Sequence, residues 1–299
     1  MLTLDSFYQN VEWRHDQIDE SEPYEHEGSL VTYVLLPKIT IGLSAWWNIT
    51  IEKYIGHRQM DWYRDEISAH HREEGSHSNF ANAKGGLLGD TKLNLKFLLF
   101  NEGRGQGIRM FLGGGVVLPS KNQLTVSPFL KDENDSYYEH RHFSIGTGVY
   151  RANVNVQSFY KRKINPVFFG ISLNIDEPIK NSKYGFSGSR LYKVAFSTLF
   201  NKNNPINRPI SISCVISHNG KAFWNDVLAP NSESTIITPG IGILGSLGSI
   251  SYSINFQKPI FLDIFLPESG NTLNQKAEAW QLSLSIRRVL DYYIPWLYW

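Results

Sequence analysis

The sequence has no long hydrophobic run, a single cysteine and no excess of charge of either sign. Because Cys214 is alone, no disulfide can form within the chain, and we expect this residue to be a small apolar side chain on a strand face. The 29 basic and 28 acidic residues give a net charge of +1 and are dispersed, which gives no reason to expect nucleic acid as a partner. No apolar run approaches the roughly 18 residues that a membrane-spanning helix needs. A helical membrane protein is therefore excluded.

The sequence also has no linker and almost no helical periodicity. No segment rich in Pro and Ser and no run of like charge divides the chain, so we predict one domain over residues 1–299. Ten or eleven short segments instead alternate apolar and small polar residues with a period of two, which is the periodicity of β-strands.

Residues 91–100 show this alternation most clearly. Polar and apolar side chains take turns in the order Lys92, Leu93, Asn94, Leu95, Lys96, Phe97. A soluble sandwich would carry charge opposite its core, whereas most polar faces here consist of Ser, Asn, Gln and Gly. Aromatic residues make up 13% of the chain, and membrane barrels place such rings in girdles at the water boundaries. The sequence therefore predicts a membrane β-barrel.

The predicted strands number twelve. We place them at residues 6–13, 29–36, 39–54, 90–100, 108–118, 147–160, 167–175, 189–200, 209–218, 234–244, 249–258 and 278–290. Their connections alternate between short turns, the first at Pro37–Lys38, and long loops such as residues 55–89. Outer-membrane barrels have short periplasmic turns, long external loops and an even number of strands. The predicted fold is all-β: a single antiparallel transmembrane β-barrel of about twelve strands, with an N-terminal strand and loop in residues 1–28 and an aromatic tail in residues 291–299.

Five stretches occur in an order that resembles a known family. They are GLLGDTKLNLKFLLF, GGGVVLPSKN, EHRHFSIGTG, NSKYGFSGS and TPGIGILGSLGSISYSINFQKPIF, and they span roughly residues 29–290. In this order they are similar to the outer-membrane β-barrel transporter family labelled "MetA-pathway of phenol degradation". The resemblance implies a barrel and transport, but no substrate and no catalytic residue. The LPSKN stretch and the DYYIPWLYW tail depart from the family pattern.

If the apolar parity faces lipid, the opposite parity lines the interior. The candidate solute-contacting residues are Lys92, Lys96, Arg151, Asn153, Asn155, Lys193 and Arg287. Five of these are basic, and Glu52 is the only acidic residue of matching parity that the predicted strands contain. We therefore predict an outer-membrane channel that passes a small polar or anionic solute through a basic lumen. The alternative is that these side chains fill the barrel, because barrels of about eight strands are filled and those of sixteen or more are open.

Six of the nine histidines fall in two predicted external loops. They are His57, His70, His71, His77, His140 and His142. His140 and His142 are two residues apart, so on an extended backbone both point the same way and could bind Zn²⁺ or Cu²⁺, joined by His70 or His71. Because their spacing fits no standard zinc signature, the simpler interpretation is polar loop residues and no cofactor. A structural or partner-binding surface barrel, whose His-rich loops contact a metal or another protein, is the second interpretation of function.

A lipid-facing enzyme is the third interpretation. His142 and Ser144 share a strand face and are similar to the His-x-Ser of outer-membrane phospholipase, which uses an Asn to orient its imidazole. Asn153 and Asn155 have the opposite parity to His142 unless a bulge in between shifts the register. We therefore expect no enzymatic activity.

The first ten residues, MLTLDSFYQN, contain no basic segment followed by an apolar stretch, which a secretory signal would show. Because an outer-membrane protein needs such a signal, we expect the sequence to start near the mature N-terminus, with the signal peptide removed. The expected location is the outer membrane of a Gram-negative bacterium. Outer-membrane lipid and a small-molecule solute are the expected partners.

Overall fold

A computed structural model describes residues 1–15, 25–63, 87–103, 105–127, 144–201, 208–229, 232–264 and 275–291. Twelve strands in these ranges form one wall. They are β1 (Leu2–His15), β2 (His26–Gly42), β3 (Trp47–Trp62), β4 (Leu88–Asn101), β5 (Gly107–Leu118), β6 (Tyr150–Lys161), β7 (Phe168–Lys180), β9 (Leu191–Phe200), β10 (Ile210–Asn219), β13 (Ser234–Leu247), β14 (Ile250–Gln257) and β16 (Gln275–Arg288). None of the described residues belongs to a helix long and apolar enough to cross a membrane.

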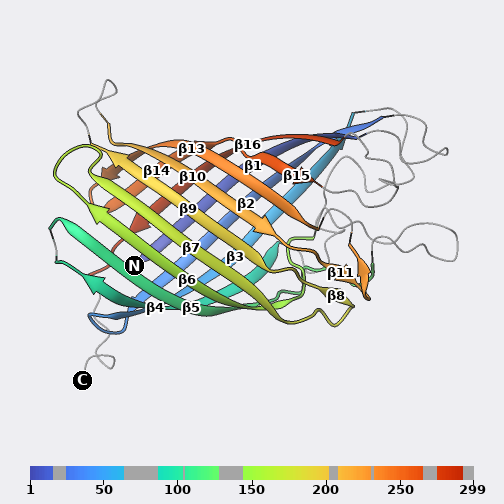
Figure 1. Ribbon diagram of the computed structural model, residues 1–299, viewed down its shortest axis with the longest axis horizontal. Helices are drawn as coiled ribbons and strands as arrows, with labels where there is room; N and C mark the ends of the chain where they lie inside the picture. The colour runs from blue at the N-terminus through green and yellow to red at the C-terminus, as the bar shows by residue number, and fades with distance from the viewer. Residues whose placement is uncertain are drawn as a thin grey trace, which may run out of the picture.

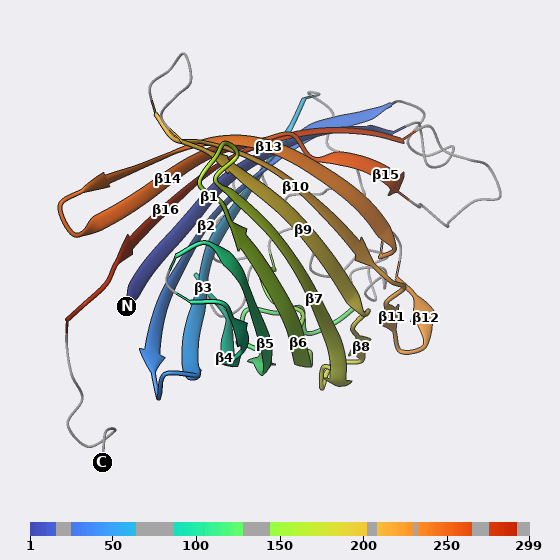
Figure 2. The ribbon, with the colours of Figure 1, turned by 60° about the vertical axis from the view of Figure 1, so that its left-hand side comes forward.

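The twelve strands close into a barrel (Figures 1 and 2). Each wall strand pairs antiparallel with two neighbours, and the two ends of the chain meet where β1 pairs with both β2 and β16. The short strand β15 (Ile260–Ile264) follows β14 in the sequence. It pairs with β13, as β14 does, and therefore continues the position of β14 in the wall. The prediction of a twelve-stranded antiparallel barrel is confirmed by this pairing.

The register places apolar side chains on the outside of the wall. On β16, Trp280, Leu282 and Leu284 are 37–46% exposed. On β6, the side chain of Val154 is 51% exposed, whereas its neighbours Asn153 and Asn155 are only 2% and 6% exposed. An apolar outer face over a polar inner face is the pattern of a barrel surrounded by lipid.

Two glycines open the inner face of β5. A Cβ atom on Gly115 would collide with the backbone oxygen of Leu93, and one on Gly113 would lie 2.5 Å from the side-chain oxygen of Asn155. The outward-facing Gly114 between them has its nearest neighbour at 3.6 Å, which is an ordinary contact distance. Because positions 113 and 115 carry no side chain, polar residues of β4 and β6 can meet across β5.

The two ends of the barrel differ in the length of their connections. The short ones are residues 43–46, 102–106, 162–167, 201–209 and 248–249, and the long ones include residues 63–87, 119–149 and 220–233. At the long-loop end stands a small sheet of β8 (Phe186–Ser187), β11 (Phe223–Trp224) and β12 (Val227–Leu228), visible beside the barrel mouth in Figure 2. All three of these short strands fall in connections between the predicted strands.

The predicted turn at Pro37–Lys38 is wrong. Both residues lie inside β2, and the chain turns instead at residues 43–46, where the Ser44 hydroxyl accepts hydrogen bonds from two following backbone amides at 3.1 Å. Proline has no N–H, so the pairing of β2 with β3 is interrupted at Pro37. Pairing with β1 continues through Leu4, which keeps the strand intact.

The predicted long loop over residues 55–89 is also wrong at its start. Strand β3 continues to Trp62, so His57 is a strand residue rather than a loop residue. The apolar alternation that marks the start of β3 fades after Ile55, which is why the sequence pattern ends there while the backbone pairing with β2 goes on.

Candidate functional site

The predicted lumen residues share one face of the wall. The register places Lys92 and Lys96 on β4, Arg151, Asn153 and Asn155 on β6, Lys193 on β9 and Arg287 on β16, all with the parity opposite to the apolar belt. The structure brings most of them together, but Arg287 lies far along the barrel, next to Thr3 at the short-turn end.

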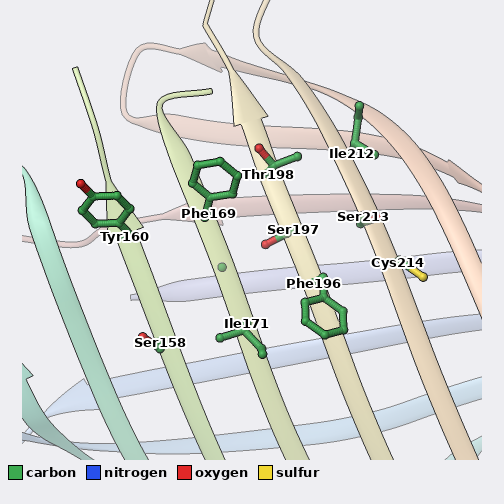
Figure 3. A pocket seen from close by; sticks show the side chains of 11 residues that line it. Ser158, Tyr160, Phe169, Ile171, Phe196, Ser197, Thr198, Ile212, Ser213 and Cys214 are labelled. Carbon is green, nitrogen blue, oxygen red and sulfur yellow. The ribbon is translucent and has the colours of Figure 1, made fainter. Parts of the chain in front are cut away.

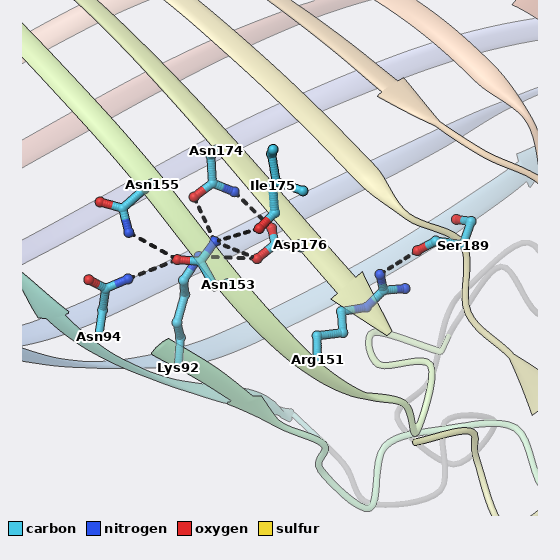
Figure 4. Close-up of polar contacts among 9 residues, drawn as sticks. All are labelled: Lys92, Asn94, Arg151, Asn153, Asn155, Asn174, Ile175, Asp176 and Ser189. Atoms are coloured by element: carbon cyan, nitrogen blue, oxygen red, sulfur yellow. Dashed lines mark hydrogen bonds and ion pairs between the residues drawn. The ribbon is translucent and has the colours of Figure 1, made fainter. Parts of the chain in front are cut away.

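Asn153 is the centre of a buried network on this face (Figure 4). Its Nδ2 donates to Asn174 at 2.8 Å and to the Asp176 carboxylate at 2.7 Å. Its Oδ1 accepts from Asn94 at 2.8 Å and from Asn155 at 3.1 Å. These contacts join β4, β6 and β7 across the side-chain-free positions of β5. Such a network fixes side-chain positions, because a buried amide left without partners costs about 1–3 kcal/mol.

Charged residues continue the network along the same wall. Lys38 Nζ lies 2.8 Å from an Asp5 carboxylate oxygen and 2.7 Å from one of Glu52. Lys92 on β4 lies directly opposite Glu52 on β3, and its Nζ is 3.6 Å from a carboxylate oxygen of Asp176 on β7. Acidic and basic side chains therefore alternate from β1 to β7.

Two further lysines on this wall form no ion pair within the described residues. Lys96 Nζ donates to the neutral Gln157 Oε1 at 2.8 Å. Lys193 is exposed although it points inward, so free space lies beside it in the barrel. The charges that act on Lys193 are those of Lys92, Lys38, Asp176 and Glu52. Among the described residues at this level of the inner wall, four lysines thus face three carboxylates, which leaves an excess of one positive charge.

The prediction that Glu52 is the only inward-facing acid is wrong. Asp5 and Asp176 each lie one residue outside a predicted strand, at 6–13 and 167–175, and Lys38 lies in the wrongly predicted turn. Extending the alternation by one residue at these strand ends would have found both acids. The lumen is therefore less basic than the sequence suggests, although its sign at this level stays positive.

The histidines proposed as metal ligands, His70, His71, His140 and His142, lie outside the described residues. Within the described ranges no group of three or more His, Cys, Asp or Glu side chains is arranged to hold a metal. Ser144, the proposed nucleophile of the enzyme interpretation, is described. Its carbonyl oxygen accepts a hydrogen bond from the inward-facing Arg58 at 2.7 Å, so Ser144 lies inside the barrel mouth and not on the lipid-facing surface that this interpretation requires.

A hollow of about 390 Å³ interrupts the apolar belt on the outer wall (Figure 3). Large side chains such as Phe169, Ile171 and Phe196 surround it, and smaller ones, among them Cys214, leave the space. Cys214 is a free cysteine on the outward parity of β10, as a small residue on a strand face. No charged side chain lines this hollow.

Comparison with solved structures shows the same fold in an outer-membrane protein. The COG4313 outer membrane channel from Pseudomonas putida F1 matches with a TM-score of 0.52 and 11% identity, over 97% of this chain and 95% of that one. The NanC porin matches with a TM-score of 0.45 and 9% identity, over 96% of this chain and all of that one. No family model matches the chain, and no curated protein matches it. At 11% identity the likeness to the channel establishes the fold and nothing finer.

Proposed function

We propose that this protein is an outer-membrane channel that passes small polar or anionic solutes along the wall formed by β4, β6, β7 and β9. The observation that carries the proposal is the inward-facing Lys193, which is exposed inside the barrel and lies among four charged neighbours. Free space beside an excess cation is what an anion-conducting path requires.

Three further observations support a membrane channel. The outward-facing rows of Ile, Leu, Phe and Trp fit a lipid environment. The order of the turn-and-strand stretches resembles an outer-membrane transporter family. The fold is shared with an outer membrane channel. Together they support a place in the outer membrane of a Gram-negative bacterium.

Selectivity in a planar lipid bilayer tests the proposal. We expect purified protein to conduct, and its reversal potential in a salt gradient to show a preference for anions. Replacing the two lysines that form no ion pair within the described residues, in Lys96→Gln/Lys193→Gln, should reduce this preference. In the matched control Lys163→Gln, the lost lysine is exposed in a short turn, and the preference should stay. The preference of the native chain should also fade at 1 M salt, where the screening length falls to about 3 Å.

Two results would refute the proposal. A chain that inserts into bilayers without any conductance has a filled barrel. Cation preference, or an unchanged preference in the double variant, means that Lys96 and Lys193 do not set the field in the path.

A further inference from the structure

The hollow on the outer wall lies at the short-turn end of the barrel, beside the turn of residues 162–167 that joins β6 to β7 (Figure 3). It takes in two outward positions on each of β6, β7, β9 and β10. The rings of Phe169 and Phe196 form its walls, and the small side chains of Ser158 and Cys214 leave the space. Strands of membrane barrels tilt by about 35–45°, so a hydrocarbon chain along the membrane normal crosses several strands. A hollow of about 390 Å³ across four strands offers a place for such a chain.

Tyr160 marks the membrane boundary at this end of the wall. Its side chain lines the hollow and is 47% exposed, and the turn of residues 162–167 begins two positions later. Tyrosine rings of membrane barrels lie at the level of the lipid headgroups, because the ring is apolar while the hydroxyl needs polar partners. The side chains of the turn therefore lie at headgroup level, and the hollow extends from there toward the hydrocarbon.

Arg162 places a positive charge at the wall of the hollow. Its guanidinium carbon lies 5.6 Å from the centre of the Phe169 ring, which is a cation–π contact. The backbone amide of Arg162 donates to the Val167 carbonyl oxygen at 2.8 Å and so closes the turn. Within the described part of the chain, Arg162 forms no ion pair. A fixed cation thus stands where the apolar hollow meets the headgroup region.

The sequence around the hollow is basic as a whole. Residues 158–171 and 196–214, which include every lining residue, contain five Lys or Arg residues and no Asp or Glu. The complete chain is almost balanced, with 29 basic and 28 acidic residues, so the imbalance belongs to this part of the wall. A partner of this surface therefore needs an apolar body and a negative charge at headgroup level.

One acid reaches this end of the barrel from the turn that joins β4 to β5. The Glu102 carboxylate accepts a hydrogen bond from the Ile108 backbone amide at 2.8 Å and lies against Gly107. Gly107 is directly opposite Lys161, so Glu102 acts on Lys161 more than on the following residue. Arg162, on the side toward β7, remains the charge at the hollow.

We propose that the hollow binds one anionic phospholipid from the leaflet on the short-turn side of the membrane. An acyl chain lies between the rings of Phe169 and Phe196, and the phosphate lies beside Arg162, within the basic part of the wall. Lipid surrounds the whole apolar belt, so burial alone selects no occupant. Selection comes from close packing against the walls and from the charge of the headgroup.

The site rests on the outer-membrane location in the proposed function, and it is independent of conduction. Short turns of outer-membrane barrels face the periplasm, so the leaflet in question is the periplasmic one. A second copy of this chain suits the surface less well. In a two-fold dimer within one membrane the same patch meets itself, which would bring two Arg162 side chains together at the same level.

Native mass spectrometry of the detergent-solubilised full chain tests the proposal with two lipids. Dioleoyl phosphatidylglycerol is anionic, and dioleoyl phosphatidylcholine has the same acyl chains but no net charge. We expect one phosphatidylglycerol to be retained per chain, with an affinity at least about fivefold higher than that of phosphatidylcholine, because one basic residue near a lipid surface contributes about this factor.

Arg162 variants test the headgroup end of the site. Arg162→Gln should weaken phosphatidylglycerol by about fivefold and leave phosphatidylcholine unchanged, and Arg162→Lys should keep most of the preference. Arg288→Gln is the matched control. Arg288 is exposed at the same end of the barrel, on β16, which contributes no residue to the hollow. Its loss should leave the affinity for both lipids unchanged.

A larger side chain tests the hollow itself. Cys214→Phe fills the space, so both lipids should bind about threefold more weakly or worse, because the acyl chain loses its contacts with the walls. Val154→Phe is the matched control, since Val154 also faces outward on β6 but does not line the hollow. Binding should not change in this variant. Circular dichroism of every variant shows whether the barrel is folded.

Equal affinity for the two lipids, or unchanged phosphatidylglycerol binding in folded Arg162→Gln or Cys214→Phe, would overturn the proposal. Lipid-free dimers that disappear in Cys214→Phe would also overturn it, because a second copy then occupies the surface. Bilayer recordings on the same preparation distinguish these failures from that of the channel. An anion-selective channel that binds both lipids equally retains the proposed function and loses the lipid site. A non-conducting barrel that selects phosphatidylglycerol loses the channel and retains the site.

Discussion

Neighbouring residues of this chain lie in opposite environments. Asn153 is almost fully buried with four side-chain partners, while Val154 next to it is half exposed on the outer face. The same inversion separates Leu284 from Ser285 on β16: Leu284 is 37% exposed on the apolar belt, and the Ser285 hydroxyl donates to Asp5 at 2.5 Å inside the barrel. The effect of a single substitution on stability should therefore depend on whether its position faces lipid or the lumen.

Arginine substitutions at these two positions test which face meets lipid. We expect Leu284→Arg to lower the free energy of unfolding in lipid vesicles by about 2–4 kcal/mol, because it places a charge in the hydrocarbon. Ser285→Arg should have little effect, since its side chain faces the lumen and the Asp5 carboxylate. Urea titrations of the vesicle-bound protein measure both values. Equal losses at the two positions would contradict the assignment of the faces.

At the scale of the strands, the absence of side chains at two positions on the inner face of β5 determines how its neighbours β4 and β6 pack. The inner face of β5 has no side chain at positions 113 and 115, so the amides of Asn94 and Asn153 meet directly over it at 2.8 Å. The run of glycines thus serves close packing between strands.

Alanine substitutions in β5 test this role. Gly115→Ala should destabilise the barrel by about 1–3 kcal/mol, the usual cost of forcing extra atoms into a packed site, because its Cβ meets the backbone oxygen of Leu93. Gly114→Ala, with its nearest neighbour at 3.6 Å, should be neutral or slightly stabilising because alanine loses less entropy than glycine. Unfolding titrations compare the two variants. A cost at Gly114 equal to that at Gly115 would show that the effect is not steric.

The sequence predicts the wall strands well because period-two alternation is a property of each strand by itself. The turn that it predicts at Pro37 is wrong, because the N–H that proline lacks affects only the pairing of β2 with β3. Pairing with β1 on the other side still holds Pro37 in the strand. The strands β8, β11 and β12 have two residues each, too few for any periodicity, and their positions follow from contacts between loops. The same limit hides the contact between Phe186 and Trp224, which are 38 positions apart in the sequence and meet through the pairing of β8 with β11.

For the whole molecule, the closing seam joins the two ends of the chain. Fourteen residue pairs connect β1 to β16, from Leu2 opposite Arg288 to His15 opposite Gln275. A sheet that wraps fully has no edge to aggregate or to expose backbone polar groups to lipid. The polar inner face also continues across the seam, because the Ser285 hydroxyl of β16 donates to the Asp5 carboxylate of β1 at 2.5 Å.

A designed disulfide across this seam tests closure directly. In a Cys214→Ala background, which removes the single native cysteine, Gln9→Cys and Gln281→Cys place two thiols directly opposite each other on the inner face. Facing residues of an antiparallel pair have Cβ atoms about 4.5–5.5 Å apart, within reach of a disulfide after a small adjustment. Gln9→Cys with Ser285→Cys is the matched control, because position 285 shares the face but lies about 13 Å further along β16. We expect mass spectrometry of the oxidised, folded protein to find the linked peptides in the first variant and free thiols in the second. Free thiols in both, or equal cross-linking in both, would contradict the closed register of β1 and β16.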